Sequence, residues 1–167
     1  NLTHLNINTT WYPQKGYQGL NTLSRLSRLS LRGNSLLAAH KLAALLHQVG
    51  SLTNLADLRL DLHAGDTHSL DCLAGLTHLS DLDLRLAASN VHTLDPLAAL
   101  TGLTRLTIDL DNTPVTSLRP LHTLDRLTHL ALNLNNCDVQ TLQPLSQLDS
   151  LQSLTLQAAH HHRNTLR

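Results

Sequence analysis

The chain has 167 residues, enough for one domain with a sizeable core. It contains 44 Leu but only two Ile, four Val and three aromatic residues, with neither Phe nor Met. Twelve basic residues balance twelve acidic ones, so no basic field points to nucleic acid or anionic membranes. No apolar run approaches the length that spans a bilayer, and no signal peptide is visible. A core of one side-chain shape indicates one packing solution used repeatedly.

The sequence repeats itself every 24 residues. Leu52, Leu76, Leu100, Leu124 and Leu148 each open the phrase L-x-x-L-x-x-L-x-[LI]. A second phrase follows in step, reading SLDCL, TLDPL, SLRPL and TLQPL, with TLR at the chain end. Because two further units precede these, the pattern predicts a single solenoid of about seven units. The predicted units are 1–22, 23–51, 52–75, 76–99, 100–123, 124–147 and 148–167.

Each unit is predicted to begin with a strand. Leucines alternate with polar residues there, and a period of two indicates one buried and one exposed face. Copies in register would then pair as a parallel sheet. A further leucine after the usual pair, as at Leu62 and Leu110, predicts strands about two residues longer than is typical. In the second unit, SLLAAHKLAALLHQVG (35–50) has the apolar spacing of an amphipathic α-helix that ends at Gly50.

The second phrase is predicted to form a short helical turn on the opposite side of the coil. One column of hydroxyl residues is expected to cap these turns, namely Ser69, Thr93, Ser117, Thr141 and Thr165. The prolines at 96, 120 and 144 fall three residues later, in the first turn, where a missing N–H costs little.

These phrases resemble leucine-rich repeats, whose general form is L-x-x-L-x-L-x-x-[NC]-x-L. The [ST]-L-x-P-L return is similar to that of the internalin-like group of bacterial surface proteins and its intracellular eukaryotic relatives. The resemblance covers essentially the whole chain. It implies an α/β solenoid, a right-handed coil with a parallel β-sheet on the concave face and short helices or turns on the convex face. The unit here is slightly longer than that group's, and its consensus Asn position is poorly kept.

Exposed strand positions should form columns along the concave face. The column Arg32–Asp61–Arg85–Asp109 is predicted to be a ladder of opposite charges, because neighbouring strands lie about 4.8 Å apart. Such a ladder either keeps the register, each exposed pair contributing about 0–1 kcal/mol, or docks a charged partner. The candidate partner-binding residues are Arg32, Arg59, Asp61, Asp83, Arg85, Arg105, Asp109 and Asn133.

The aromatic residues gather in WYPQKGYQG (11–19). Tyr17 takes the place of a core leucine, whereas Trp11 and Tyr12 either cover the end of the core or form a contact loop for a partner. Terminal repeats need a polar cap, and no cap motif appears at either end. We therefore expect a segment of a longer solenoid or ends covered by other domains or subunits, with capping by this loop as the alternative.

Metal and cofactor sites are not expected. His68 and His92 share a column, but two histidines alone make a weak site, and the His160–His162 run fits a solvated turn. The stretch TIDLDNTP (107–114) begins like a calcium loop, yet such a loop needs Gly and Glu at its sixth and twelfth positions. Counted from Asp109, those positions hold Pro114 and Pro120.

Catalysis is not expected either. Acid–base candidates such as Asp61 and His63 would lie on an open face, without the burial that shifts a pKa. Cys72 and Cys137 fall in different columns and in well-separated units, 52–75 and 124–147, too far apart for a disulfide, so free thiols are predicted.

The sequence therefore predicts a non-catalytic protein–protein interaction module that binds through its concave face. The alternative is a structural scaffold or a filament subunit that stacks through uncapped solenoid ends. The expected partner is a protein or a neighbouring subunit; nucleic acid, membrane insertion, a cofactor and a small-molecule ligand are not expected. Intracellular and cell-surface locations both stay open.

Overall fold

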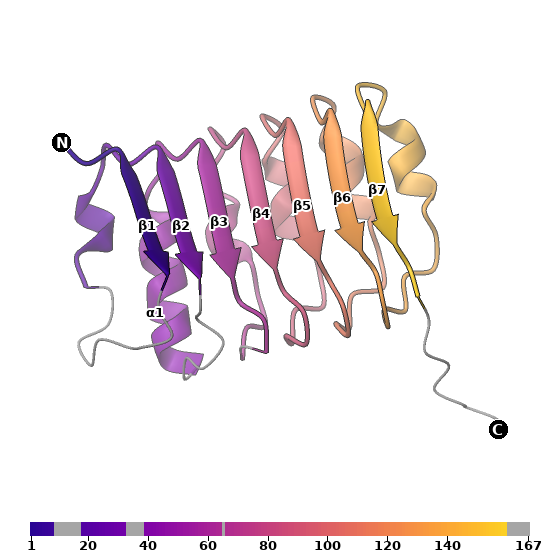
Figure 1. Ribbon diagram of the computed structural model, residues 1–167, viewed down its shortest axis with the longest axis horizontal. Coiled ribbons are helices and arrows are strands. Elements are labelled where there is room, and N and C mark those ends of the chain that lie inside the picture. Colours follow the sequence, from indigo (N-terminus) through magenta and orange to yellow (C-terminus); the bar gives the residue numbers. More distant parts are fainter. Residues whose placement is uncertain (9–17, 33–38, 65, 160–167) are drawn as a thin grey trace.

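The computed structural model describes residues 1–8, 18–32, 39–64 and 66–159. Its seven parallel strands form one sheet in chain order, so each strand pairs with the strand of the next coil. All helical segments lie on one side of the sheet, and the other side is open (Figure 1). This open face is the one that the sequence predicts to be concave. The strands are β1 (His4–Asn8), β2 (Arg28–Arg32), β3 (Asp57–Asp61), β4 (Asp81–Arg85), β5 (Arg105–Asp109), β6 (His129–Asn133) and β7 (Ser153–Gln157).

In the described part of the chain the helical layer contains one α-helix and several short 3-10 helices, as the sequence predicts. The α-helix α1 (Ala39–Gly50) covers the described part of the predicted 35–50 helix, and its Leu42, Leu45 and Val49 are buried. The 3-10 helices are η1 (Leu20–Thr22), η2 (Asp71–Leu73), η3 (Asp95–Ala99), η4 (Arg119–Thr123) and η5 (Gln143–Gln147). Among the described residues no helix is both long and apolar enough to cross a bilayer.

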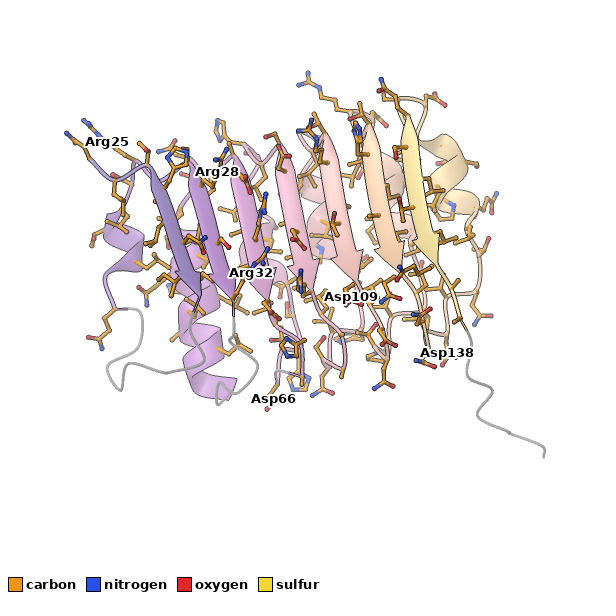
Figure 2. All side chains as sticks on the ribbon, viewed as in Figure 1. Arg25, Arg28, Arg32, Asp66, Asp109 and Asp138 are labelled. Carbon is orange, nitrogen blue, oxygen red and sulfur yellow. The ribbon has the colours of Figure 1, made fainter. Side chains whose placement is uncertain are left out.

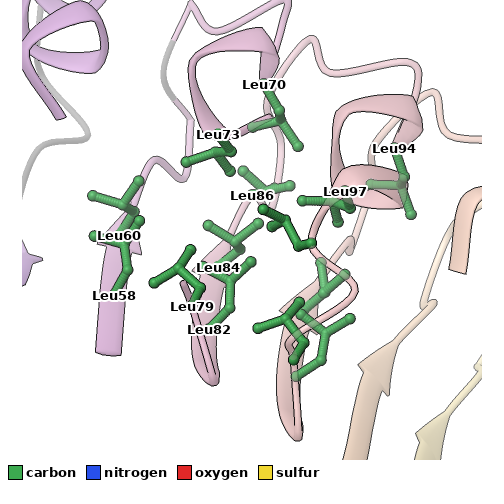
Figure 3. Close-up of a cluster of buried hydrophobic side chains, with 14 of the residues drawn as sticks. Leu58, Leu60, Leu70, Leu73, Leu79, Leu82, Leu84, Leu86, Leu94 and Leu97 are labelled. Carbon is green, nitrogen blue, oxygen red and sulfur yellow. The ribbon is translucent and has the colours of Figure 1, made fainter. Parts of the chain in front are cut away.

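The core is a stack of leucines between the two layers. Leucines from the strands, such as Leu58 and Leu84, meet leucines from the 3-10 helices, such as Leu73 and Leu97 (Figure 3). Each of these four side chains is fully buried. Because the same contact recurs in each coil, a chain almost without aromatic residues can still form a continuous core.

The hydroxyl residues predicted to be the N-caps of the 3-10 helices lie one residue before the N-cap instead. The N-cap residues are leucines without a side-chain cap, for example Leu70 and Leu94. The hydroxyl of Ser69 instead accepts the backbone N–H of Asp71 at 3.0 Å, and that of Thr93 accepts the N–H of Asp95 at 3.1 Å. These side chains therefore form a turn that leads into the helix. Thr165 lies outside the described residues.

The strands themselves are five residues long, so the prediction of longer strands is wrong. The backbone ladder nevertheless continues past them. The N–H of Leu62 donates to the carbonyl of Arg85 at 2.8 Å, and the N–H of Ala64 donates to that of Ala87 at 2.7 Å. The extra leucines thus lengthen the hydrogen-bonded contact between coils without extending the strands.

A residue in the left-handed region turns the chain after four of the strands. These residues lie 24 positions apart: Ala64, Ala88, Asn112 and Asn136, with φ between 50° and 56°. Asparagine adopts this conformation readily, whereas alanine does so only at a cost of about 1–2 kcal/mol. Two of the four turns are therefore strained.

Replacing Ala88 by glycine should stabilise the protein by about 0.5–1 kcal/mol, because glycine relieves the left-handed strain and this gain exceeds its greater entropy loss on folding. The midpoint of urea unfolding would measure this change. Ala87→Gly is the matched control, since Ala87 does not have a positive φ, and it should destabilise. An equal loss of stability in both variants would contradict this interpretation.

Hydroxyl groups also link consecutive coils just before the strands. Thr104 donates its side-chain hydroxyl to the carbonyl of Ser80 at 3.1 Å, and Thr128 donates to that of Thr104 at 2.9 Å. Ser80 makes the same bond to Ala56 at 3.0 Å. The same carbonyls also accept backbone N–H groups. Each coil is therefore joined to the preceding one, just before its strand, by a hydroxyl bond and backbone bonds to one carbonyl, and these bonds fix its register.

Candidate functional site: the open face of the sheet

The strand register places the polar side chains of the open face in three columns. Most neighbouring members of a column are opposite Cα partners in the sheet, for example Arg59 with Asp83 and Asp61 with Arg85. The columns are His4, Arg28, Asp57, Asp81, Arg105, His129 and Ser153; Asn6, Ser30, Arg59, Asp83, Thr107, Ala131 and Thr155; and Asn8, Arg32, Asp61, Arg85, Asp109, Asn133 and Gln157. The predicted columns are thus confirmed. Figure 2 shows the side chains on this face, with Arg28, Arg32 and Asp109 labelled.

The ion pairs of this face lie in a different column from the predicted ladder. Asp57 accepts Nε of Arg28 at 2.9 Å and lies 3.6 Å from Nε of Arg59. Arg105 contacts Asp81 at 3.2 Å. Among the described residues no ion pair links Arg32, Asp61, Arg85 and Asp109, so the ladder prediction is wrong. These partly exposed pairs contribute about 0–1 kcal/mol each.

Three of the predicted site residues form the turns that end their strands. Asp109 accepts the backbone N–H of Asp111 at 3.1 Å, and Asn133 accepts that of Asn135 at 3.1 Å. Asn133 also donates its side-chain amide to Asp109 at 2.9 Å. Asp61, which is buried, contacts Nδ1 of His63 two residues on. Local hydrogen bonds therefore satisfy these side chains before a partner arrives.

Arg32, Asp83 and Arg85 remain without an ion pair among the described residues. Arg85 is exposed, whereas Arg32 and Asp83 are half-buried. Together with Arg59 and Asp61 they line a small hollow over β3 and β4. The open face therefore holds its least compensated charges near its middle.

A second, larger hollow lies beside the first, toward β7. Its floor includes the small side chains Thr107, Ala131 and Thr155 of the middle column, and Arg85 and Asp109 contribute to its rim. In β3 and β4 the same column holds Arg59 and Asp83. The loss of side-chain bulk from β5 onward thus hollows this half of the face.

Other candidate groups do not form a reactive site. Burial raises the pKa of the Cys72 thiol to about 11, so little thiolate is present at neutral pH. Both cysteines are free, which confirms the prediction. No group of three metal-ligating side chains occurs among the described residues; His68 instead contacts Asp66 at 2.9 Å. Trp11, Tyr12, Tyr17 and His160–His162 lie outside the described part of the chain.

The helical side carries a further hollow, between α1 and the chain before η2, lined by Leu42, Leu46, Thr67 and Cys72 among others. Thr67 takes the position that Val91, Val115 and Val139 hold in later coils. It is 3% exposed, and its hydroxyl has no hydrogen-bond partner. A buried hydroxyl without a partner costs about 1–3 kcal/mol.

Replacing Thr67 by valine should therefore stabilise the protein by about 1 kcal/mol, because valine has the same shape and no polar group to desolvate. Thermal unfolding of the two proteins would test this. The matched control is Thr113→Val, because the hydroxyl of Thr113 donates to the carbonyl of Leu110 at 2.8 Å and its loss should destabilise. If Thr67→Val destabilised as much as the control, the hydroxyl would have an unrecognised partner.

The parallel sheet, the short helices on its other side and the stacked leucines together define a class of protein fold. The chain has the leucine-rich-repeat solenoid fold, and its structure is similar to those of internalins. Its fold is similar to that of internalin C2 from Listeria monocytogenes, with a TM-score of 0.60 and 28% identity over 82% of this chain and 64% of that one. Internalin InlF from the same bacterium matches with a TM-score of 0.67 and 28% identity over 93% of this chain and 47% of that one.

The chain thus spans only about half to two thirds of the length of these relatives. No protein-family model matches the sequence, and no curated protein does so. The structural likeness supports a protein-interaction module in general terms. It assigns no role to individual residues.

Proposed function

We propose that the protein is a non-catalytic recognition module that binds a protein partner through the open face of its sheet. The observation that carries this proposal is the central group Arg32, Asp83 and Arg85, whose charges lack ion pairs among the described residues. Exposed charges without partners are available for complementary groups of another protein, where they steer association and select the partner. The neighbouring hollow offers a concave surface for a partner side chain.

The other predicted site residues have a smaller part in this proposal. Asp61, Asp109 and Asn133 are held by bonds of the turns, so they shape the face more than they contact a partner. Arg105 is paired with Asp81, and freeing it would cost that pair. Partner affinity should therefore depend most on Arg32, Asp83 and Arg85, and on Arg59, whose contact with Asp57 is the longest ion pair of this face, at 3.6 Å.

The charge exchange Arg59→Asp with Asp83→Arg should lower the affinity for the natural partner by at least roughly tenfold, or about 1.4 kcal/mol. The exchange keeps the net charge but reverses the local field. The partner would be captured from the source cells, and binding measured by calorimetry. The matched control is Asp125→Arg with Arg126→Asp, an exposed pair outside the strands. If both exchanges weakened binding equally, or neither did, the open face would not be the interface.

A second candidate function is a structural one, in which copies or further repeats stack end to end. It is favoured by exposed leucines in the end coils: Leu2 is 46% exposed and Leu154 is 47% exposed. Both belong to the outermost described coils, where Leu5, Ile7, Leu151 and Leu156 are only partly buried against the core. Sedimentation of the purified chain separates the two functions. A recognition module should be a monomer, whereas a stacking subunit should form assemblies that Leu154→Arg disperses.

A further inference from the structure

Two features of the open face lie side by side and share two residues, Asp83 and Arg85. The first hollow is lined by three arginines, Arg32, Arg59 and Arg85, together with Asp61 and Asp83. The second hollow has the floor of small side chains around Ala131. Arg85 lines both hollows. A partner segment that crossed the strands would meet the first hollow over β3 and β4 and the second over β5 to β7.

The first hollow is too small to hold a water molecule, so a carboxylate would lie over it, on the charged side chains that line it. Its acidic members are Asp61 and Asp83, and Asp61 is buried against His63. Arg59 shares Asp57 with Arg28, which lies closer, at 2.9 Å against 3.6 Å. Three arginines thus face two carboxylates, and the local charge is positive. Arginine suits this role because its planar group can bind a carboxylate through two parallel hydrogen bonds.

The second hollow fits an aromatic ring. Thr107, Ala131 and Thr155 form a floor without long side chains, on which a flat ring can lie. Arg85 at the rim can stack on that ring, since guanidinium groups are attracted to aromatic faces. Aromatic residues also provide much of the binding energy in protein interfaces because they bury a large area with few rotatable bonds.

We propose that the open face binds a protein segment that carries an acidic residue and an aromatic residue about four positions apart, a spacing set by the sheet itself. Arg59 lies on β3 and Ala131 on β6, which are separated by three strand spacings of about 4.8 Å, or roughly 14 Å. An extended chain advances about 3.3 Å per residue, so about four residues cover this distance. The inference rests on the proposed recognition function and adds the chemistry of the partner segment.

The test is a selection of short random peptides displayed on phage, with the full chain immobilised as the target. The selected peptides should be enriched in Asp or Glu about four residues from Trp, Tyr or Phe. A synthetic peptide with the consensus should lose at least roughly tenfold in affinity against Arg59→Glu and against Ala131→Arg. Matched controls are Arg126→Glu and Ala99→Arg, exposed residues outside the open face, which should bind as well as the wild type.

Circular dichroism would confirm that each variant is folded. Moving the aromatic residue next to the acidic one in the synthetic peptide should also reduce its affinity, because the acidic group could then not reach the arginines while the ring lies in the second hollow. Selected peptides that bind the open face without this pair would overturn the proposed segment but not the recognition function. Peptides that lose affinity only against Arg126→Glu or Ala99→Arg would contradict both proposals. A selection without any binder of the open face would also overturn the proposed segment.

Discussion

Replacing Leu106 by alanine should destabilise the protein by about 3 kcal/mol, within the range of about 2–5 kcal/mol for large cavities in a core. Leu106 lies in β5 and is 1% exposed. Its register partners are Leu82 on one side and Leu130 on the other. A cavity at this place removes contacts with both neighbouring coils, and a core of identical leucines has no flexible side chain that could fill it. Urea unfolding would measure the loss.

The matched control is Leu154→Ala in the last described strand. Leu154 belongs to the same column as Leu106 but is 47% exposed and has a described neighbour on one side only. This substitution should destabilise the protein by less than about 1 kcal/mol, because the exposed Leu154 side chain gains only part of the free energy of burial when the protein folds. Equal effects at the two positions would contradict the stacked core, since the position of a coil in the stack would then have no influence.

Replacing Gly50 by alanine should destabilise the protein by about 1–3 kcal/mol. A Cβ at Gly50 would lie 2.6 Å from the backbone oxygen of Cys72 and 3.2 Å from its Cβ. The clash is with the backbone, so no rotamer change relieves it. Alanine is favoured over glycine in a helix by about 1 kcal/mol, and Gly50 is the last residue of α1. The clash outweighs this gain because α1 and η2 would have to separate.

Gly75→Ala serves as the control for this substitution. The nearest atom to a Cβ at Gly75 is the backbone oxygen of Gly50, at 3.9 Å, an ordinary contact. We therefore expect a change of at most about 0.5 kcal/mol, typical of a surface substitution. Thermal unfolding of both variants would show the difference. A more stable Gly50→Ala protein would mean that the helix does not approach the third coil as closely as the structure shows.

The arrangement of strands could be predicted from the sequence because the repeat and the strand share one register. Once Leu58, Leu82 and Leu106 are placed in one column, the position of every exposed strand residue in the sheet follows. The same register places Asp109 of TIDLDNTP on the open face, opposite Arg85. Asn112 then turns the chain with a positive φ of 54°.

The side-chain partners could not be predicted in this way. Adjacent positions in a column allow an ion pair but do not require it. Asp61 and Asp109 end their strands, where bonds to the turn are available at little entropic cost. Those local bonds replace the expected contacts with Arg32 and Arg85. Asp57 and Asp81 form ion pairs instead, and their positions in the first column were the only sign of this in the sequence.

The turns show a second limit of prediction from the repeat. The recurrence of Asn112 and Asn136 at 24-residue spacing is a signal for the left-handed region. Ala64 and Ala88 adopt the same conformation without any such signal, because their own N–H groups and those two residues before them bond to the next coil and so restrain the backbone there. Tertiary structure overrides local preference at these two alanines.

The proposed binding face is tested most directly by photo-cross-linking in the source cells. A photoreactive amino acid would replace Ala131 on the open face in one protein and Ala99 at the end of η3 in another. If the open face recognises a protein, Ala131 should yield a discrete cross-linked partner that the Arg59–Asp83 charge exchange removes, and Ala99 should not. A partner cross-linked from Ala99 but not from Ala131 would place recognition on the helical side and contradict the proposed function.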